Sequence, residues 1–255
     1  MAHRSDGNEM SLAVAQIKAR PENFRGSLAT HVRMAEEAAR RGARFLLFPE
    51  LSLTGYSRAL SAADTVDATT SDLAPLAEIS CCQQMVISVG LPLAATGGLL
   101  IASLSFLPDG RRSVYTKRYL HAGEEKTFAV GTGGPLLSAG ERRIGMAICA
   151  EINHRAHIEQ TLESGAHVYA ASCFLTPNGY DADCLRLEQY ARQYGVVVLM
   201  ANFAGPSGGI ASAGRSAIWD EGGQLLARAP ATEEYLVLAT RARDTWSGSV
   251  HPVSI

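Results

Sequence analysis

Short apolar runs alternate with helix-like stretches along most of the sequence, and this alternation limits the folds open to the chain. Helical spacing of apolar residues marks residues 21–41 and 181–194, and a glycine follows each, at Gly42 and Gly195. The strand-like runs are residues 11–17, 43–49, 85–91, 99–107, 113–116, 144–149, 166–172, 196–202, 215–219, 224–228 and 235–239. Strands that alternate with helices, and turn signals at residues 108–110 and 139–141 that indicate hairpins, predict an α/β protein with helices outside its sheets.

The composition is that of a globular chain with a large core. Of its 255 residues, 47% are hydrophobic and 19% are charged. The length would allow two average domains, but no repeat, low-complexity tract or linker divides the sequence. We therefore predict a single domain over residues 11–255. Residues 1–10 are polar and lack the apolar segment of a signal peptide, so we expect a frayed N-terminus.

Charge and cysteine content exclude several classes of protein. A net charge of −2 with scattered arginine pairs gives no basic patch for nucleic acid, and no run approaches the ~18 apolar residues of a membrane span. Five cysteines, an odd number without secretory context, argue against a disulfide framework. Cys149, His154 and His157 are close in sequence but lack the spacing of a metal motif. The sequence therefore predicts a cytoplasmic protein without a metal or other cofactor.

Three of the strand-like runs end on a reactive group. Glu50 follows residues 45–49, Lys117 follows residues 113–116, and Cys149 follows residues 144–148. Functional groups in open α/β sheets gather at strand ends. Alone, Cys149 could be a small buried apolar residue, and Glu50 or Lys117 a solvated charge. A thiol, a carboxylate and an amine in the same setting together favour an enzyme.

The segments around these residues resemble the signatures of the nitrilase superfamily, the carbon–nitrogen hydrolases. Residues 48–56 (FPELSLTGY), 115–120 (YTKRYL) and 145–151 (GMAICAE) match in order and spacing. Residues 124–131 (EEKTFAVG) resemble the segment that carries the family's second glutamate, and residues 214–220 (GRSAIWD) resemble its late strand. The resemblance covers about residues 11–239.

The resemblance implies a four-layer αββα sandwich, paired into a homodimer or a higher homo-oligomer. It also implies hydrolysis of a non-peptide C–N bond in a small amide substrate, without a cofactor. Cys149 would attack the carbonyl carbon and form a thioester, with its thiol activated by a neighbouring ammonium. Glu50 would move the protons, Lys117 would stabilise the oxyanion, and Glu124, or else Glu125, would hold Lys117.

Substrate contacts are expected from residues near the strand ends. The sequence departs from the family where Ala150 and Glu151 replace an aromatic residue and Asp, so the preferred substrate of a relative does not carry over. The predicted pocket residues are Tyr56, Glu125, Ala150, Asn153, His154, Phe174 and Asn202.

Other functions stay open at this point. Nitrile hydrolysis or acyl transfer would use the same triad, and a catalytically silent binding module would keep the fold alone. Residues 205–209 (GPSGG) match the GxSxG motif of serine hydrolases, with Asp220 or Asp244 and His251 in triad order. The nucleophile of that motif must open a helix, and the glycine-rich stretch after Ser207 disfavours one. The sequence therefore favours an amidase-like hydrolase.

Overall fold

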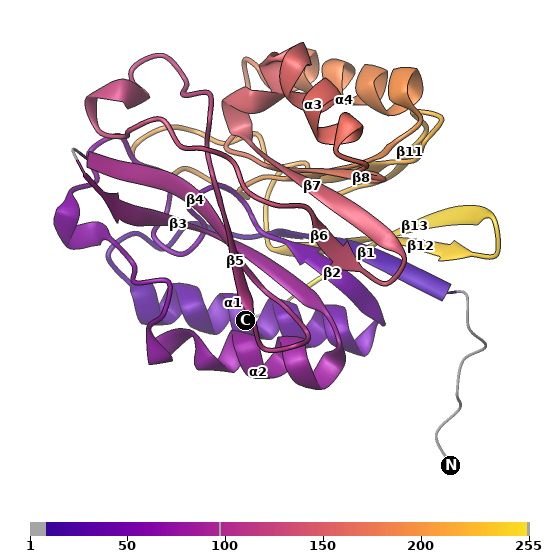
Figure 1. Cartoon of the computed structure of the whole chain (residues 1–255), viewed down its shortest axis with the longest axis horizontal. Helices are drawn as coiled ribbons and strands as arrows, with labels where there is room; N and C mark the ends of the chain where they lie inside the picture. The colour runs from indigo at the N-terminus through magenta and orange to yellow at the C-terminus, as the bar shows by residue number, and fades with distance from the viewer. Residues whose placement is uncertain (1–8, 97, 254–255) are drawn as a thin grey trace.

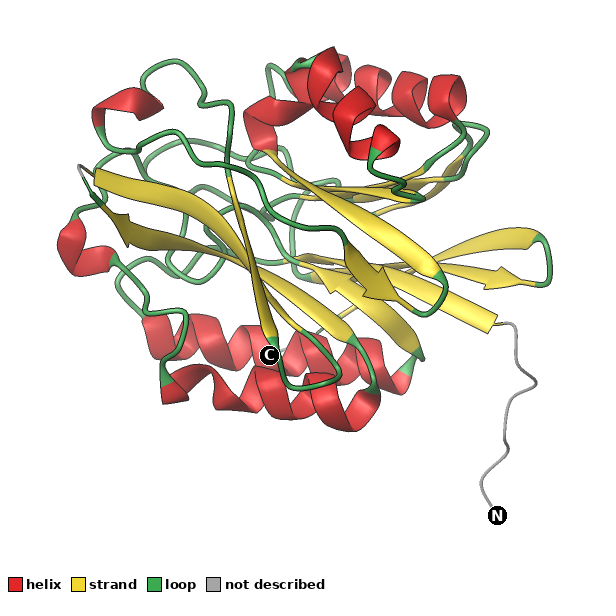
Figure 2. Cartoon of the chain, in the orientation of Figure 1, coloured by secondary structure: helices red, strands yellow, loops and turns green. Residues whose placement is uncertain are grey.

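Two β-sheets lie face to face between two layers of helices in the computed structural model, which describes residues 9–96 and 98–253 (Figure 1). One helix layer consists of α1 (Phe24–Arg40) and α2 (Ala74–Gln83), and the other of α3 (Arg155–Glu163) and α4 (Tyr180–Tyr194). Figure 2 shows the order helices, sheet, sheet, helices. This arrangement confirms the expected four-layer αββα sandwich.

The larger sheet has seven strands in the order β13-β12-β1-β2-β3-β4-β5. Its strands are β1 (Glu9–Gln16), β2 (Ala43–Leu47), β3 (Val86–Ala95), β4 (Gly98–Phe106), β5 (Arg112–Thr116), β12 (Tyr235–Ala242) and β13 (Thr245–Pro252). β1, β2 and β3 are parallel, and the other neighbours are antiparallel. Parallel neighbours need a crossover connection, which α1 and α2 provide. The β4–β5 hairpin confirms the turn signal at residues 108–110.

The smaller sheet has six strands in the order β11-β10-β9-β8-β7-β6. Its strands are β6 (Leu137–Ala139), β7 (Arg142–Ile148), β8 (Val168–Ser172), β9 (Val197–Ala201), β10 (Ala217–Trp219) and β11 (Leu225–Arg228). β7, β8 and β9 are parallel, and all residues of β8 and β9 are buried. Strands covered on both faces are apolar along their whole length, which explains why these runs show no alternation of polar residues.

Helix α1 buries part of the face that its apolar spacing predicts, together with polar residues beside it. Its buried residues are Ser27, Thr30, His31, Met34, Ala35 and Ala38. Of the residues at the predicted spacing, Ala35 is buried, whereas Leu28, Val32 and Ala39 are half-buried and pack against the core. The buried His31 is hydrogen-bonded at both nitrogens: Nδ1 donates to the Ser27 carbonyl at 2.7 Å, and Nε2 lies 2.9 Å from the Ser52 hydroxyl oxygen. Hydrogen-bonded polar groups can be buried at little cost.

The ends of the chain differ from the sequence expectation in two ways. β1 begins at Glu9, inside the stretch expected to fray, whereas residues 1–8 lie outside the described residues. Strand β13 has no counterpart among the predicted elements. It is an edge strand whose residues are exposed or half-buried, so it lacks the apolar pattern that marks a strand.

Within the part of the chain that the structure describes, no helix has both the length and the apolar character required to cross a bilayer. The same residues contain no group of three His, Cys, Asp or Glu side chains arranged to hold a metal ion.

Candidate active site

The three predicted reactive residues lie at strand ends that come from both sheets. Glu50 follows β2 and Lys117 follows β5 in the seven-stranded sheet, whereas Cys149 follows β7 in the six-stranded sheet. Their side chains meet between the sheets. The Nζ of Lys117 donates to Oε1 of Glu50 at 2.7 Å, and the charges of both residues act on the Cys149 thiol. The structure therefore brings the predicted trio together.

The Glu50 loop is anchored to both sheets. The Phe48 N–H donates to the Ser88 carbonyl of β3 at 2.9 Å, while the hydroxyl of Ser172 in β8 donates to the Phe48 carbonyl at 2.8 Å. Gly90 allows the loop to lie directly on β3, because a Cβ at this position would lie 2.3 Å from the Leu51 nitrogen. These contacts hold Glu50 where the sheets face each other.

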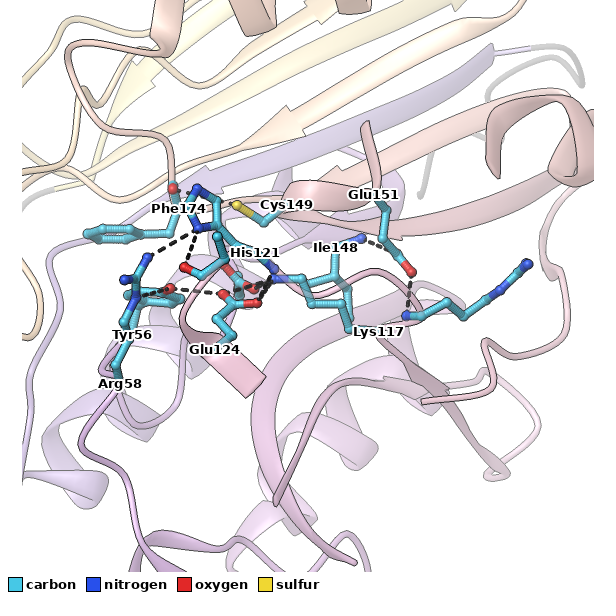
Figure 3. Close-up of polar contacts among 12 residues, drawn as sticks. Tyr56, Arg58, Lys117, His121, Glu124, Ile148, Cys149, Glu151 and Phe174 are labelled. Atoms are coloured by element: carbon cyan, nitrogen blue, oxygen red, sulfur yellow. Dashed lines mark hydrogen bonds and ion pairs between the residues drawn. The ribbon is translucent and has the colours of Figure 1, made fainter. Parts of the chain in front are cut away.

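The Lys117 ammonium is fully buried between two carboxylates. Besides Glu50, it donates to Glu124, at 3.0 Å to Oε1 and 2.8 Å to Oε2 (Figure 3). Burial acts against the charge of Lys117, but Glu50, Cys149 and Glu124 outweigh it and raise its pKa. Lys117 therefore carries a fixed positive charge at the centre of the site.

Glu124, on the 3₁₀ turn η3 (Glu124–Lys126), is the second glutamate of this cluster. Its carboxylate also accepts from the Tyr56 hydroxyl at 2.8 Å and from the His121 N–H at 2.7 Å. Glu125 points elsewhere: it is exposed, and its Oε2 accepts from the Gly123 N–H at 2.6 Å. Of the two candidates, the structure places Glu124 against Lys117 and leaves Glu125 on the surface.

Cys149 lies at the junction between β7 and the 3₁₀ helix η4 (Cys149–Asn153). Its φ of +45° is in the left-handed region, which is strained for a residue with a Cβ and is typical of functional positions. The thiol is buried and donates to the Phe174 carbonyl at 3.6 Å. The backbone thus turns sharply at the sulfur-bearing residue.

Two pKa shifts determine how the thiol can react. Burial, with the Glu50 charge adding to it, raises the pKa of Cys149 well above its usual range, while Lys117 opposes the rise. The ammonium therefore acts in the expected direction, but burial and the Glu50 charge outweigh it. Burial also raises the pKa of Glu50 to about 7, against the effect of Lys117. A thiol that rests protonated needs a base, and Glu50 titrates in the range where a base is most effective.

The predicted pocket residues divide into three groups. Tyr56 and Phe174 stack at a ring distance of 4.6 Å beside the cluster, and Ala150 is buried next to Cys149. Asn153 and His154 are exposed, with the His154 ring stacked on Tyr119. Asn202 is different again: it is buried, accepts from the Leu175 N–H and donates to the Gly214 carbonyl. It therefore holds loops together.

The structure also contains polar residues that the sequence interpretation missed. Glu151, Tyr115 and His157 are buried and connected by hydrogen bonds beside Lys117 and Cys149. Arg58 is exposed beside this cluster, and its Nε donates to the Tyr56 hydroxyl at 3.4 Å. A carboxylate two residues after the nucleophile was visible in the sequence, but nothing there indicates its burial.

The GxSxG segment does not form a nucleophile elbow. Ser207 and Ile210 exchange backbone hydrogen bonds at 3.0 Å, which closes a tight turn with no helix behind it. His251 hydrogen-bonds Ser249 on the exposed strand β13, and Asp220 accepts from the Gly222 and Gln224 N–H groups. The structure thus gives Ser207 neither partner of a serine triad.

Comparison with known proteins identifies the family and finds the same fold in solved structures. The sequence model of the carbon–nitrogen hydrolases matches residues 11–248, so the chain belongs to the carbon–nitrogen hydrolase family. Among solved structures, it is similar to a double mutant of the amidase from Nesterenkonia sp. AN1 in complex with acrylamide, with a TM-score of 0.84 and 23% identity over 94% of this chain and 93% of that one. A single mutant of the same amidase, with acrylamide added at the active-site cysteine, gives a TM-score of 0.82 and 24% identity over 92% and 94% of the two chains.

Proposed function

We propose that this protein hydrolyses small linear amides through a thioester on Cys149, releasing a carboxylic acid and ammonia or an amine. The observation that carries the proposal is the Lys117 ammonium buried between Glu50 and Glu124, with its charge acting on the Cys149 thiol. The Nesterenkonia amidase, similar in fold, binds acrylamide and butyramide in mutant form, which supports amides of this size.

In the proposed first half-reaction, the Glu50 carboxylate takes the thiol proton as the sulfur attacks the amide carbon. The carbonyl oxygen becomes an oxyanion, which Lys117 and the Ala150 N–H stabilise. The C–N bond then breaks, and Glu50 gives its proton to the departing nitrogen. One amine leaves, and the acyl group stays on the sulfur.

In the second half-reaction, water attacks the thioester while Glu50 takes one of its protons. The C–S bond breaks, the acid is released, and the proton returns to the sulfur. Glu124 holds Lys117 throughout and does not exchange protons with the substrate. Tyr56 and Phe174 line the side where the acyl group binds, and their stacked rings favour apolar groups.

Intact mass spectrometry of the wild-type enzyme, quenched with acid during the first turnover, tests this proposal. Acid stops thioester hydrolysis, so we expect acyl groups from a panel of amides on Cys149, whereas Glu50→Gln, which lacks the base for the thiol proton, should carry none. An amide that has lost ammonia or amine adds only its acyl mass, whereas a nitrile adds its whole mass as a thioimidate. Peptide mapping locates the adduct, and Cys149→Ala is the control. An adduct on another residue would refute the proposed nucleophile.

The activity should depend on the ionisation of Glu50. Because burial raises its pKa to about 7, the carboxylate is protonated below that pH and cannot accept the thiol proton. We expect kcat/KM to fall roughly tenfold for each pH unit below about 7, since this ratio reports ionisations of the free enzyme. Initial rates of ammonia release between pH 5 and 9 measure the profile. A rate that stays constant down to pH 5 would contradict the role of Glu50.

A further inference from the structure

One buried carboxylate connects the backbone on either side of the reactive cluster. Glu151 accepts from the Arg118 N–H at 2.6 Å and from the Ile148 N–H at 2.7 Å. Arg118 directly follows Lys117, and Ile148 directly precedes Cys149. Because β5 and β7 belong to different sheets, Glu151 joins the ends of two strands that have no ladder hydrogen bonds in common (Figure 3).

Glu151 lies at one end of a chain of hydrogen-bonded side chains. Its Oε2 accepts from the Tyr115 hydroxyl at 2.9 Å, and the oxygen of Tyr115 lies 2.7 Å from Nε2 of His157. Since Tyr115 gives its only proton to Glu151, it accepts from Nε2–H, which leaves Nδ1 of His157 to accept from the Tyr169 hydroxyl at 2.9 Å. With the Glu151 carboxylate as the acceptor, all these contacts are satisfied when His157 is neutral and carries its proton on Nε2.

The pKa of His157 agrees with a neutral imidazole. Burial, with the charges of Arg118 and His154 adding to it, lowers the pKa of His157 to about 4. For Glu151, burial raises the pKa, but the N–H groups of Arg118 and Ile148 and the Tyr115 hydroxyl act in the opposite direction. These three donors favour the ionised form of the carboxyl.

We propose that Glu151 is a positioning residue that sets the distance between the Lys117 ammonium and the Cys149 sulfur. This inference depends on the proposed function, because it assigns Glu151 a part in the same reaction without contact with the substrate. Cys149 has a strained backbone with φ of +45°, so its placement depends on neighbouring anchors such as the Ile148 N–H contact. A displacement of about 1 Å between reacting groups can lower a rate by ~10²-fold.

The test compares Glu151→Gln with the wild-type enzyme. The amide has the shape of the carboxylate, but its NH₂ group would face a donor from Arg118, Ile148 or Tyr115. We expect kcat to fall ~10²-fold and KM to change by less than about threefold, because the substrate contacts are intact. The rate of Cys149 alkylation by iodoacetamide should also fall, by about tenfold, since it depends on the same geometry.

Two further variants keep the result interpretable. Glu234→Gln is the matched control: Glu234 is also buried and accepts from the Lys18 N–H, Arg20 and Arg33 outside the reactive cluster. We expect Glu234→Gln to lower Tm, as we expect of Glu151→Gln. Unlike Glu151→Gln, Glu234→Gln should keep the kcat and the alkylation rate of the wild type. Tyr115→Phe removes one donor and keeps both backbone contacts of Glu151, and we expect it to lower kcat by about three- to tenfold.

The inference is overturned if folded Glu151→Gln has the kcat and alkylation rate of the wild type, or if Glu234→Gln lowers kcat as strongly. Should Glu151→Gln fail to fold, an unchanged kcat in Tyr115→Phe overturns it. The alkylation rate separates the two proposals: it reports the position of Cys149 even if the protein hydrolyses no amide. A slower alkylation without amide hydrolysis would support the positioning role and refute the proposed function.

Discussion

Replacing Cys149 by Ala is expected to lower amide hydrolysis by ~10⁴–10⁶-fold, as the loss of a covalent nucleophile does in other hydrolases. Without the sulfur, no thioester forms, and neither Glu50 nor Lys117 can supply a second nucleophile in its place. The fold should persist, because Cys149→Ala removes one buried atom and typically costs about 1 kcal/mol. Ammonia release under saturating amide measures the rate, and circular dichroism checks the fold.

Cys184→Ala is the matched control for that result. Cys184 is also buried, but it lies on α4, away from the ends of β2, β5 and β7. This variant should keep the wild-type rate and lose a similar amount of stability. Substantial hydrolysis by Cys149→Ala would rule out the thioester route. The nucleophile would then have to be Ser207 or a water molecule that attacks the amide directly.

Replacing Lys117 by Met is expected to affect both activity and stability. Loss of one oxyanion donor lowers kcat by ~10²–10³-fold. Glu50 and Glu124 would then remain buried without their shared cation, and breaking a buried ion pair in this way costs about 3–5 kcal/mol. Urea denaturation at pH 7 measures the free energy of unfolding, and single-turnover kinetics measures the chemical step.

The stability loss in Lys117→Met should shrink as the pH falls. Burial already raises the pKa of Glu50 to about 7 beside Lys117, and removing the ammonium raises it further above its unfolded value, so the folded variant binds this proton more tightly than the unfolded chain. Its stability relative to the wild type therefore rises from pH 7 to pH 5. Lys126→Met, which removes an exposed lysine at the end of η3, should show neither effect. An equal loss at both pH values would contradict the carboxylate explanation.

The parts of the site that were predictable are those with a local sequence signal. Glu50, Lys117 and Cys149 each end an apolar run, and strands that end at the interface between two sheets bring such residues together. The layered fold followed in the same way from the alternation of strands and helices. These features depend on short-range patterns, which a single sequence contains.

The remaining features depend on contacts between distant segments. Glu124 and Glu125 are adjacent in sequence, and only the approach of Lys117 and Tyr56 distinguishes them. The burial of His31 on α1 involves a hydrogen bond between its Nε2 and the hydroxyl of Ser52, which lies outside the helix. The raised pKa of Cys149 depends on burial, which outweighs the nearby ammonium. None of these three features can be predicted from the spacing of residues along the chain.

Because Glu50 and Lys117 come from one sheet and Cys149 from the other, the reactive centre does not exist in either half alone. Strands β1 to β7 all precede the nucleophile in the chain, and the sulfur meets its base only when the two sheets dock. An incompletely folded chain therefore carries an ordinary thiol at position 149. Such a copy has no carboxylate beside its sulfur, so amide hydrolysis reports that both halves have come together.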